Sequence, residues 1–252
     1  MNKDFTKKST LIIKIGLLIA LLIIVAIPLL PRENMRMHNQ LAKPDENNWD
    51  YRLALTPFAP ALRGYSILID LDNLVLVLYK NAIEVKSWPV SGGTVENPSP
   101  VGSWLITEIE NWGAGFGGSW IALNVPWGIY GIHGTRLPRV VGKGNISHGC
   151  IRMKNSDVAE LKEIVSVGVP VHIKYDKIPF RELSDGNIGS DVLKLQIMLK
   201  KLKYYPDIPN GKFDTSTYKA LCQFQADEKI KVDGILGIQT WNKLKKRLDE
   251  SL

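Results

Sequence analysis

The chain has 252 residues, of which 45% are hydrophobic and 23% charged, and its formal net charge is +7. This length and composition allow one or two globular domains with substantial cores. Residues 65–174 carry no net charge, because nine Lys and Arg residues balance nine Asp and Glu residues there. A neutral central segment argues against a nucleic-acid groove, which needs a concentrated basic stripe.

An apolar run near the N-terminus predicts a membrane anchor. Residues 11–30 read LIIKIGLLIALLIIVAIPLL, which is long enough to cross a hydrocarbon core as a helix. A cleaved signal peptide is the alternative, but the run is long for one and no A-x-A-like cleavage site follows. Lysines before the run favour a cytoplasmic N-terminus, with the rest of the chain outside. We expect one uncleaved transmembrane helix, then a spacer over residues 31–64.

Residues 65–174 predict a β-rich, mainly sandwich-like domain. Two apolar runs flank Asp72 and Asn73, which is a hairpin pattern. Further stretches typical of strands are separated by Gly, Pro and Asn, and they cover residues 82–90, 101–109, 119–125 and 169–175. His172 alternates with apolar residues in the last stretch, so a packed or edge histidine is expected there rather than a ligand.

One helix is expected in this domain, over residues 155–168. Ser156 or Asp157 can cap its start, and Gly168 is expected to end it. Residues 111–120, NWGAGFGGSW, are rich in glycine and aromatic residues. They fit either a mobile loop over a groove or an ordinary packed segment.

The C-terminal part predicts a small three-helix domain over residues 189–248, reached through a linker at 175–188. A repeat supports it, because NGKFDTSTYKAL at 210–221 recurs 23 residues later as DGILGIQTWNKL at 233–244. Cys222 fits a small core residue of the second helix. We expect the two domains to bury separate cores.

Two short motifs bring histidine and cysteine together: IHGT at 132–135 and SHGCIRM at 147–153. A zinc site is one interpretation, although such sites usually draw on three or four recognisable ligands. A buried free cysteine is another, but the nearby glycines contribute little burial. A nucleophilic thiol fits best, since an imidazole can lower the thiol pKa, favour thiolate at neutral pH and shuttle the proton. No metal or other cofactor is expected.

These motifs resemble the signature of the L,D-transpeptidase catalytic domain, the YkuD family, over residues 65–174. Residues 185–248 resemble the type 1 peptidoglycan-binding domain, a three-helix bundle. Where the family usually has threonine before Pro-x-Gly, this chain has Ser99, a mild departure.

The resemblance implies roles for individual residues. Cys150 would be the nucleophile and His133 the general base, with its ring oriented by the Gly134 carbonyl. Amides around Gly149 and Cys150 would form the oxyanion hole. Arg152 would hold a substrate carboxylate or brace the loop. The substrate or oxyanion residues expected from the motif are Gly134, Ser147, His148, Gly149 and Arg152.

The implied activity is formation of 3→3 cross-links in peptidoglycan through a cysteine acyl-enzyme, at the cell membrane and facing the wall. The expected partners are peptidoglycan and, through one helix, the membrane, with no nucleic acid. Water as acceptor would make the protein an L,D-carboxypeptidase. A non-catalytic wall-binding protein and a zinc D,D-peptidase are further alternatives, and the latter would need a richer ligand set.

Overall fold

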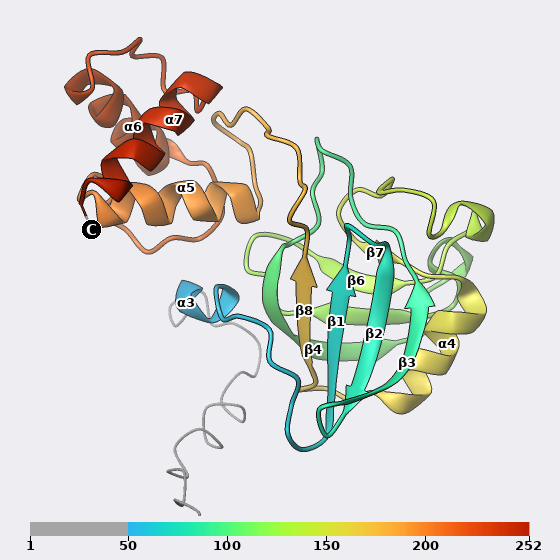
Figure 1. Cartoon of the computed structure of the whole chain (residues 1–252). Helices are drawn as coiled ribbons and strands as arrows, with labels where there is room; N and C mark the ends of the chain where they lie inside the picture. Colours follow the sequence, from blue (N-terminus) through green and yellow to red (C-terminus); the bar gives the residue numbers. More distant parts are fainter. Residues whose placement is uncertain (1–49, 252) are drawn as a thin grey trace, which may run out of the picture. The chain divides into compact units, whose positions relative to one another are not determined.

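The structure is a computed structural model that describes residues 50–251. Eight strands within these residues form one mixed sheet in the order β3-β2-β1-β8-β4-β5-β6-β7 (Figure 1). The strands are β1 (Tyr65–Asp70), β2 (Val75–Lys80), β3 (Ile83–Pro89), β4 (Gly102–Glu110), β5 (Trp120–Leu123), β6 (Tyr130–His133), β7 (Ile151–Arg152) and β8 (Pro170–Lys174). The prediction of a β-rich domain is confirmed.

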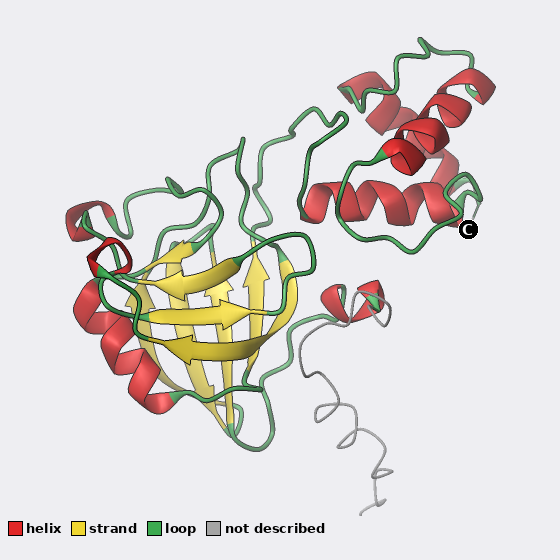
Figure 2. Cartoon of the chain, turned by 180° about the vertical axis from the view of Figure 1, so that it is seen from behind, coloured by secondary structure: helices red, strands yellow, loops and turns green. Residues whose placement is uncertain are grey.

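The sheet folds over on itself at the long strand β4. The first half of β4 pairs with β8 and its second half pairs with β5, with a register shift between Ile106 and Glu108. A bulge of this kind increases the local twist and bends the strand. The two halves of the sheet therefore face each other, as Figures 1 and 2 show, and enclose a core that includes Ile67, Trp104 and Ile132.

The predicted hairpin joins β1 to β2, which pair antiparallel from Tyr65 opposite Lys80 to Asp70 opposite Val75. Asp70 stabilises its turn, because its Oδ1 accepts hydrogen bonds from the backbone N–H groups of Asp72 and Asn73. Lys174, at the end of the neighbouring strand β8, pairs with the same carboxylate at 3.1 Å.

The one α-helix expected between residues 65 and 174, α4 (Asn155–Ile164), is shorter than predicted and lies alongside the sheet (Figure 2). Val158 and Leu161 are its buried residues. Val165 already has an extended backbone, and the Gly168 N–H donates to the Ile106 carbonyl, so Gly168 belongs to the turn that leads into β8. Lys154 occupies the cap position without a side-chain hydrogen bond, so the predicted Ser156 or Asp157 cap is wrong.

Part of the predicted spacer over residues 31–64 is folded. A short helix, α3 (Tyr51–Ala54), precedes β1, and Ala54 is buried in the core of the sheet. The predicted anchor at 11–30 lies outside the described residues. Within residues 50–251, no helix is both long and apolar enough to cross a membrane.

The C-terminal region contains the three expected helices, α5 (Ser190–Lys201), α6 (Thr215–Asp227) and α7 (Ile238–Asp249). Its repeat has a structural reason that the sequence did not reveal. The buried Gln196 side chain accepts from the N–H groups of Asn210 and Gly211 and donates to Thr217 Oγ1. Gln225 makes the same three contacts with Asp233, Gly234 and Thr240 in the second repeat.

The sequence predicts two separate cores, but the structure shows that they are partly shared. Most apolar residues of α5 pack within the helical region, but Leu193 and Ile197 belong to the core of the sheet. The Ser190 hydroxyl donates to the Val101 carbonyl at 2.8 Å. Residues 50–251 accordingly fall within one compact unit.

Candidate active site

The two halves of the motif lie on neighbouring parallel strands. In β6 and β7, Ile132 is the register partner of Ile151, and His133 is the partner of Arg152. Side chains alternate between the two faces of a strand, so His133 and Arg152 share one face while Ile132 and Ile151 point into the core. Continuing this alternation by one residue puts Cys150 on the face of His133.

Gly131 lies between these groups and has no side chain. The Cys150 thiol lies over this part of β6, with Sγ 4.0 Å from the Ile129 carbonyl. A Cβ at Gly131 would come within 2.8 Å of the Trp120 ring and 2.6 Å of the Ile121 carbonyl oxygen. Close packing against Trp120 and the Ile121 carbonyl therefore requires glycine at this position.

His133 is held in one tautomer by its own backbone. Its side chain is buried, and Nδ1 lies 2.5 Å from the Gly134 carbonyl oxygen. A carbonyl only accepts hydrogen bonds, so Nδ1 carries the proton and Nε2 has a free lone pair. This is the arrangement a general base requires, and the expected orienting role of Gly134 matches this contact.

Aromatic side chains surround the imidazole. The ring centroids of Phe116 and Trp120 lie 4.9 Å and 5.7 Å from that of His133, and Trp112 stacks on Trp120 at 4.1 Å. The Gly134 N–H also donates to the Phe116 carbonyl. Segment 111–120 is thus packed around His133, which favours the packed interpretation over a mobile loop.

Burial shifts the pKa of both His133 and Cys150 in the direction that favours the neutral form. Burial lowers the pKa of His133, the Gly134 carbonyl opposes this effect, and Arg152 adds to it. Burial raises the pKa of the Cys150 thiol, against smaller lowering effects of the Gly131 backbone and of Arg152. The directions of these two pKa shifts favour a thiol beside a neutral imidazole over the thiolate expected from the sequence.

The turn before Cys150 is closed by Ser147. Its hydroxyl donates to the Cys150 carbonyl at 2.6 Å and accepts the Gly149 N–H at 3.0 Å. Gly149 has a φ of +115°, and a Cβ there would lie 2.6 Å from the Tyr130 ring. Both the backbone conformation and the space require glycine.

The two amides expected in the oxyanion hole are not equivalent. That of Gly149 is already bonded to Ser147 Oγ. The Cys150 N–H has no acceptor among residues 50–251. Sequence reasoning could not separate these two amides, because the distinction depends on the conformation of the turn.

The remaining motif residues differ in exposure. His148 is exposed and makes no hydrogen bond with the other residues that the structure describes. The Arg152 side chain forms no ion pair within residues 50–251, although its backbone pairs with Ser91 through two hydrogen bonds. An unpaired guanidinium beside His133 is available to an anionic group.

Neither cysteine is in a disulfide. Cys222 lies in α6 as expected, but it is half-buried and not among the residues of the core. Within residues 50–251 there is no cluster of three or more His, Cys, Asp and Glu side chains with the geometry of a metal site. His172 packs as expected, with Nδ1 2.8 Å from Ser103 Oγ and its ring 5.7 Å from that of Phe58.

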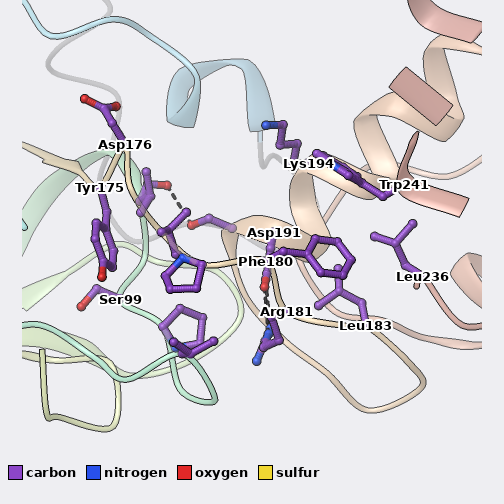
Figure 3. Close-up of a pocket in the computed structure, with 16 residues that line it drawn as sticks. Ser99, Tyr175, Asp176, Phe180, Arg181, Leu183, Asp191, Lys194, Leu236 and Trp241 are labelled. Atoms are coloured by element: carbon purple, nitrogen blue, oxygen red, sulfur yellow. Dashed lines mark hydrogen bonds and ion pairs between the residues drawn. The ribbon is translucent and has the colours of Figure 1, made fainter. Parts of the chain in front are cut away.

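A cavity of about 450 Å³ lies elsewhere and is lined by four residues of segment 95–101, by the linker and by the C-terminal helical region (Figure 3). Cys150 and His133 do not line it. Ser99 does, and the Ser99 hydroxyl also contacts the turn before Cys150. Arg181 closes this region, because it pairs with Asp191 at 2.9 Å and donates to the Glu96 carbonyl.

Comparison with known proteins identifies both parts of the chain. The L,D-transpeptidase catalytic domain, YkuD, matches residues 64–173, and a peptidoglycan-binding domain matches residues 188–244. L,D-transpeptidase YkuD of Bacillus licheniformis is 36% identical over 138 residues, covering 52% of this chain and 82% of that protein. L,D-transpeptidase YqjB of Bacillus subtilis is 32% identical over 136 residues, with coverages of 48% and 76%.

A solved L,D-transpeptidase from Mycobacterium smegmatis is 21% identical, with a TM-score of 0.38. The match covers 44% of this chain and 58% of that chain, which is less than two thirds of its length. The family assignment rests on the sequence matches.

Proposed function

The chain belongs to the YkuD family of L,D-transpeptidases, and from this membership we propose that Cys150 and His133 transfer acyl groups between peptidoglycan stem peptides. The observation that carries the proposal is the pairing of β6 with β7, which puts the imidazole and the thiol on one face of the sheet. The Nδ1 contact with Gly134 leaves Nε2 as the proton acceptor.

In the first half-reaction, Cys150 Sγ attacks the carbonyl carbon of the third residue of a tetrapeptide stem. The thiol proton passes to His133 Nε2, so that charge separates only as the bond forms. The Cys150 N–H binds the developing oxyanion. The amide bond to the terminal D-alanine then breaks, His133 protonates the leaving amine, and a thioester remains on Cys150.

In the second half-reaction, the side-chain amine of another stem attacks the thioester carbonyl. His133 takes a proton from this amine, the carbon–sulfur bond breaks, and the thiol recovers its proton. The product is a 3→3 cross-link. The low pKa of His133 supports this role, because the neutral imidazole can accept a proton at each attack.

Arg152 and His148 are assigned to substrate binding. The Arg152 guanidinium lies on the face of His133 and has no ion-pair partner among the described residues, which suits a carboxylate of the stem. His148 is exposed beside the nucleophile. Ser147 and Gly149 shape the turn rather than bind substrate, since their polar groups are bonded to each other and to Cys150.

The helical region would hold the enzyme on its polymer, as its match to a peptidoglycan-binding domain suggests. We propose that residues 11–30 anchor the chain in the cell membrane, with the N-terminus in the cytoplasm and the catalytic domain facing the wall. Protease treatment of intact cells would test this orientation. If the catalytic domain faces the wall, added protease should cleave it without lysis of the cells.

The same residues would serve an L,D-carboxypeptidase, in which water replaces the acceptor amine. A non-catalytic wall-binding protein is disfavoured, because His133 and Cys150 are both present and on one face. Amines discharge thioesters readily, which favours transpeptidation when an acceptor stem is present.

Incubation of the chain with a disaccharide-tetrapeptide, followed by mass analysis, tests the proposal. We expect an acyl-enzyme on Cys150, release of D-alanine and a cross-linked dimer. Cys150→Ala should abolish all three, and His133→Ala should slow turnover about 10²–10⁴-fold. Wild-type turnover by folded Cys150→Ala would contradict the mechanism. A hydrolysed tripeptide without dimer would favour the carboxypeptidase.

A further inference from the structure

Ser99 makes two hydrogen bonds whose directions are fixed by chemistry. Its side chain is 3% exposed, and Oγ lies 2.9 Å from the Gly93 nitrogen and 2.8 Å from the Gly149 carbonyl oxygen. The Gly93 N–H can only donate, so Oγ accepts there, and the single hydroxyl proton goes to the Gly149 carbonyl. Ser99 therefore links the loop at 93–99 to the peptide immediately before Cys150.

The Gly149 carbonyl and the Cys150 N–H belong to one peptide group. None of the described peptide bonds is cis, and in a trans peptide the C=O and N–H point in opposite directions. A bond from Ser99 to the carbonyl thus turns the Cys150 N–H away from Ser99. Gly149 permits other orientations of this peptide, because glycine populates both signs of φ.

The orientation matters because this N–H is available for catalysis. It has no acceptor among residues 50–251, whereas the preceding amide is bonded to Ser147 Oγ. We propose that Ser99 is a positioning residue that holds the Gly149–Cys150 peptide with its N–H directed at the substrate oxyanion. The inference rests on the proposed acyl transfer and adds a residue outside the histidine and cysteine motifs.

The surroundings leave little room for a substitute for the hydroxyl. A Cβ at Gly93 would lie 2.9 Å from the Gly149 Cα, so the two backbone segments touch directly. Removing the hydroxyl would leave the Gly93 N–H and the Gly149 carbonyl unpaired in a buried place. The Gly149–Cys150 peptide could then rotate, and the Cys150 N–H would no longer point at the substrate oxyanion. Threonine, which the resemblance leads one to expect here, supplies the same hydroxyl.

The test compares two reactions of Cys150 in Ser99→Ala. Acyl transfer from a tetrapeptide donor passes through an oxyanion, while alkylation by iodoacetamide displaces iodide at a CH₂ carbon and forms none. We expect kcat for acyl transfer to fall about 10–10³-fold, as for loss of an oxyanion donor. The alkylation rate constant should stay within about twofold, because the thiol and His133 are unchanged. Ser99→Thr should restore kcat.

Ser66→Ala is the matched control, since Ser66 is 1% exposed and its Oγ accepts the Ala61 N–H, which is not part of the Gly149–Cys150 turn. It should lower thermal stability without lowering kcat. Wild-type kcat in folded Ser99→Ala would overturn the inference, and so would an equal loss of acyl transfer and alkylation. If Ser99→Ala does not fold, Ser99→Cys, a weaker donor, should give reduced kcat, and wild-type kcat there would also overturn it.

This outcome is separable from failure of the proposed function. If Cys150→Ala retains turnover, the cysteine mechanism itself fails. If Cys150→Ala is inactive while Ser99→Ala is fully active, only the positioning role of Ser99 fails.

Discussion

His133 and Arg152 are register partners across the parallel strands β6 and β7, so a guanidinium lies beside the imidazole of His133. That positive charge disfavours protonation of His133 and favours ionisation of Cys150. It thereby acts on both members of the reacting pair. Arg152 lowers the pKa of His133 and also lowers the pKa of the Cys150 thiol.

Arg152→Gln should raise the pKa of both groups. The acid limb of the pH profile of kcat/KM reports the base in the free enzyme and should move to higher pH. Alkylation of Cys150 at neutral pH should become slower. Arg139→Gln, which removes an exposed arginine from the loop after β6, is the control and should change neither. An unchanged acid limb in Arg152→Gln would show that the guanidinium acts only on substrate.

In the wild-type chain, alkylation of Cys150 should rise with pH through a pKa above that of an ordinary thiol. Burial raises the pKa of this thiol, and the buried His133 does not offset it by carrying a proton. Half-buried Cys222 should therefore compete for the reagent at neutral pH. Peptide mapping after limited labelling measures both rates, with Cys222→Ser to isolate Cys150. A rate plateau for Cys150 below neutral pH would indicate a thiolate–imidazolium pair instead.

Gly149→Ala should inactivate the enzyme. The φ of +115° is strained for alanine, and the added Cβ would lie 2.6 Å from the Tyr130 ring. The turn must shift, and the Cys150 thiol and N–H shift with it. Gly144→Ala is the matched control, because its Cβ would meet only Ile146 at 4.0 Å and its φ is not positive. We expect kcat near wild type for the control; equal activity in both variants would show that this turn is not rigid.

Leu193→Ala and Leu195→Ala separate the two cores. Both side chains are buried on α5, but Leu193 belongs to the core of the sheet and Leu195 to that of the helical region. Each truncation should cost about 2–5 kcal/mol of unfolding free energy. Hydrogen exchange should show faster opening of the sheet in Leu193→Ala and of the helices in Leu195→Ala. The same pattern in both would mean that the two cores unfold together.

By the same argument, deletion of residues 185–252 would expose the apolar surface that Leu193 and Ile197 cover. The deleted form should lose stability as well as binding to walls. Thermal unfolding and turnover of a small stem peptide measure the two effects separately. An undiminished Tm would restore the original expectation of independent cores.

Local patterns in the sequence were sufficient to predict the hairpin around Asp72, the three C-terminal helices and the proximity of the two histidine and cysteine motifs. These features depend on short-range periodicity, turn residues and chemical type. The end of α4 was missed because Gly168 lies in a turn four residues beyond the helix, whose last residue is Ile164. The buried Gln196 was missed because a polar residue on a helix does not reveal which distant loop it bonds.

The site shows the same division. The residue types near Cys150 indicated a thiol nucleophile, but the protonation state depends on burial, which comes from the folded sheet. Ser99 lies 51 residues before Cys150 in the chain, and only the fold brings its hydroxyl to the Gly149 carbonyl. Leu193 belongs to α5 but packs in the core of the sheet, and helical periodicity cannot predict this packing.

The parallel pairing of β6 with β7 also separates reaction geometry from loop length. Neighbouring strands are about 4.8 Å apart whatever connects them, and parallel strands always need a long connection. Here that connection is residues 134–150, whose outer part carries exposed side chains such as Leu137. Insertions or substitutions at its tip can change which polymer fragments reach the site, while His133 in β6 and Cys150, which directly precedes β7, keep the places that the paired strands give them. Substrate range in this enzyme can thus diversify without any change in its chemistry.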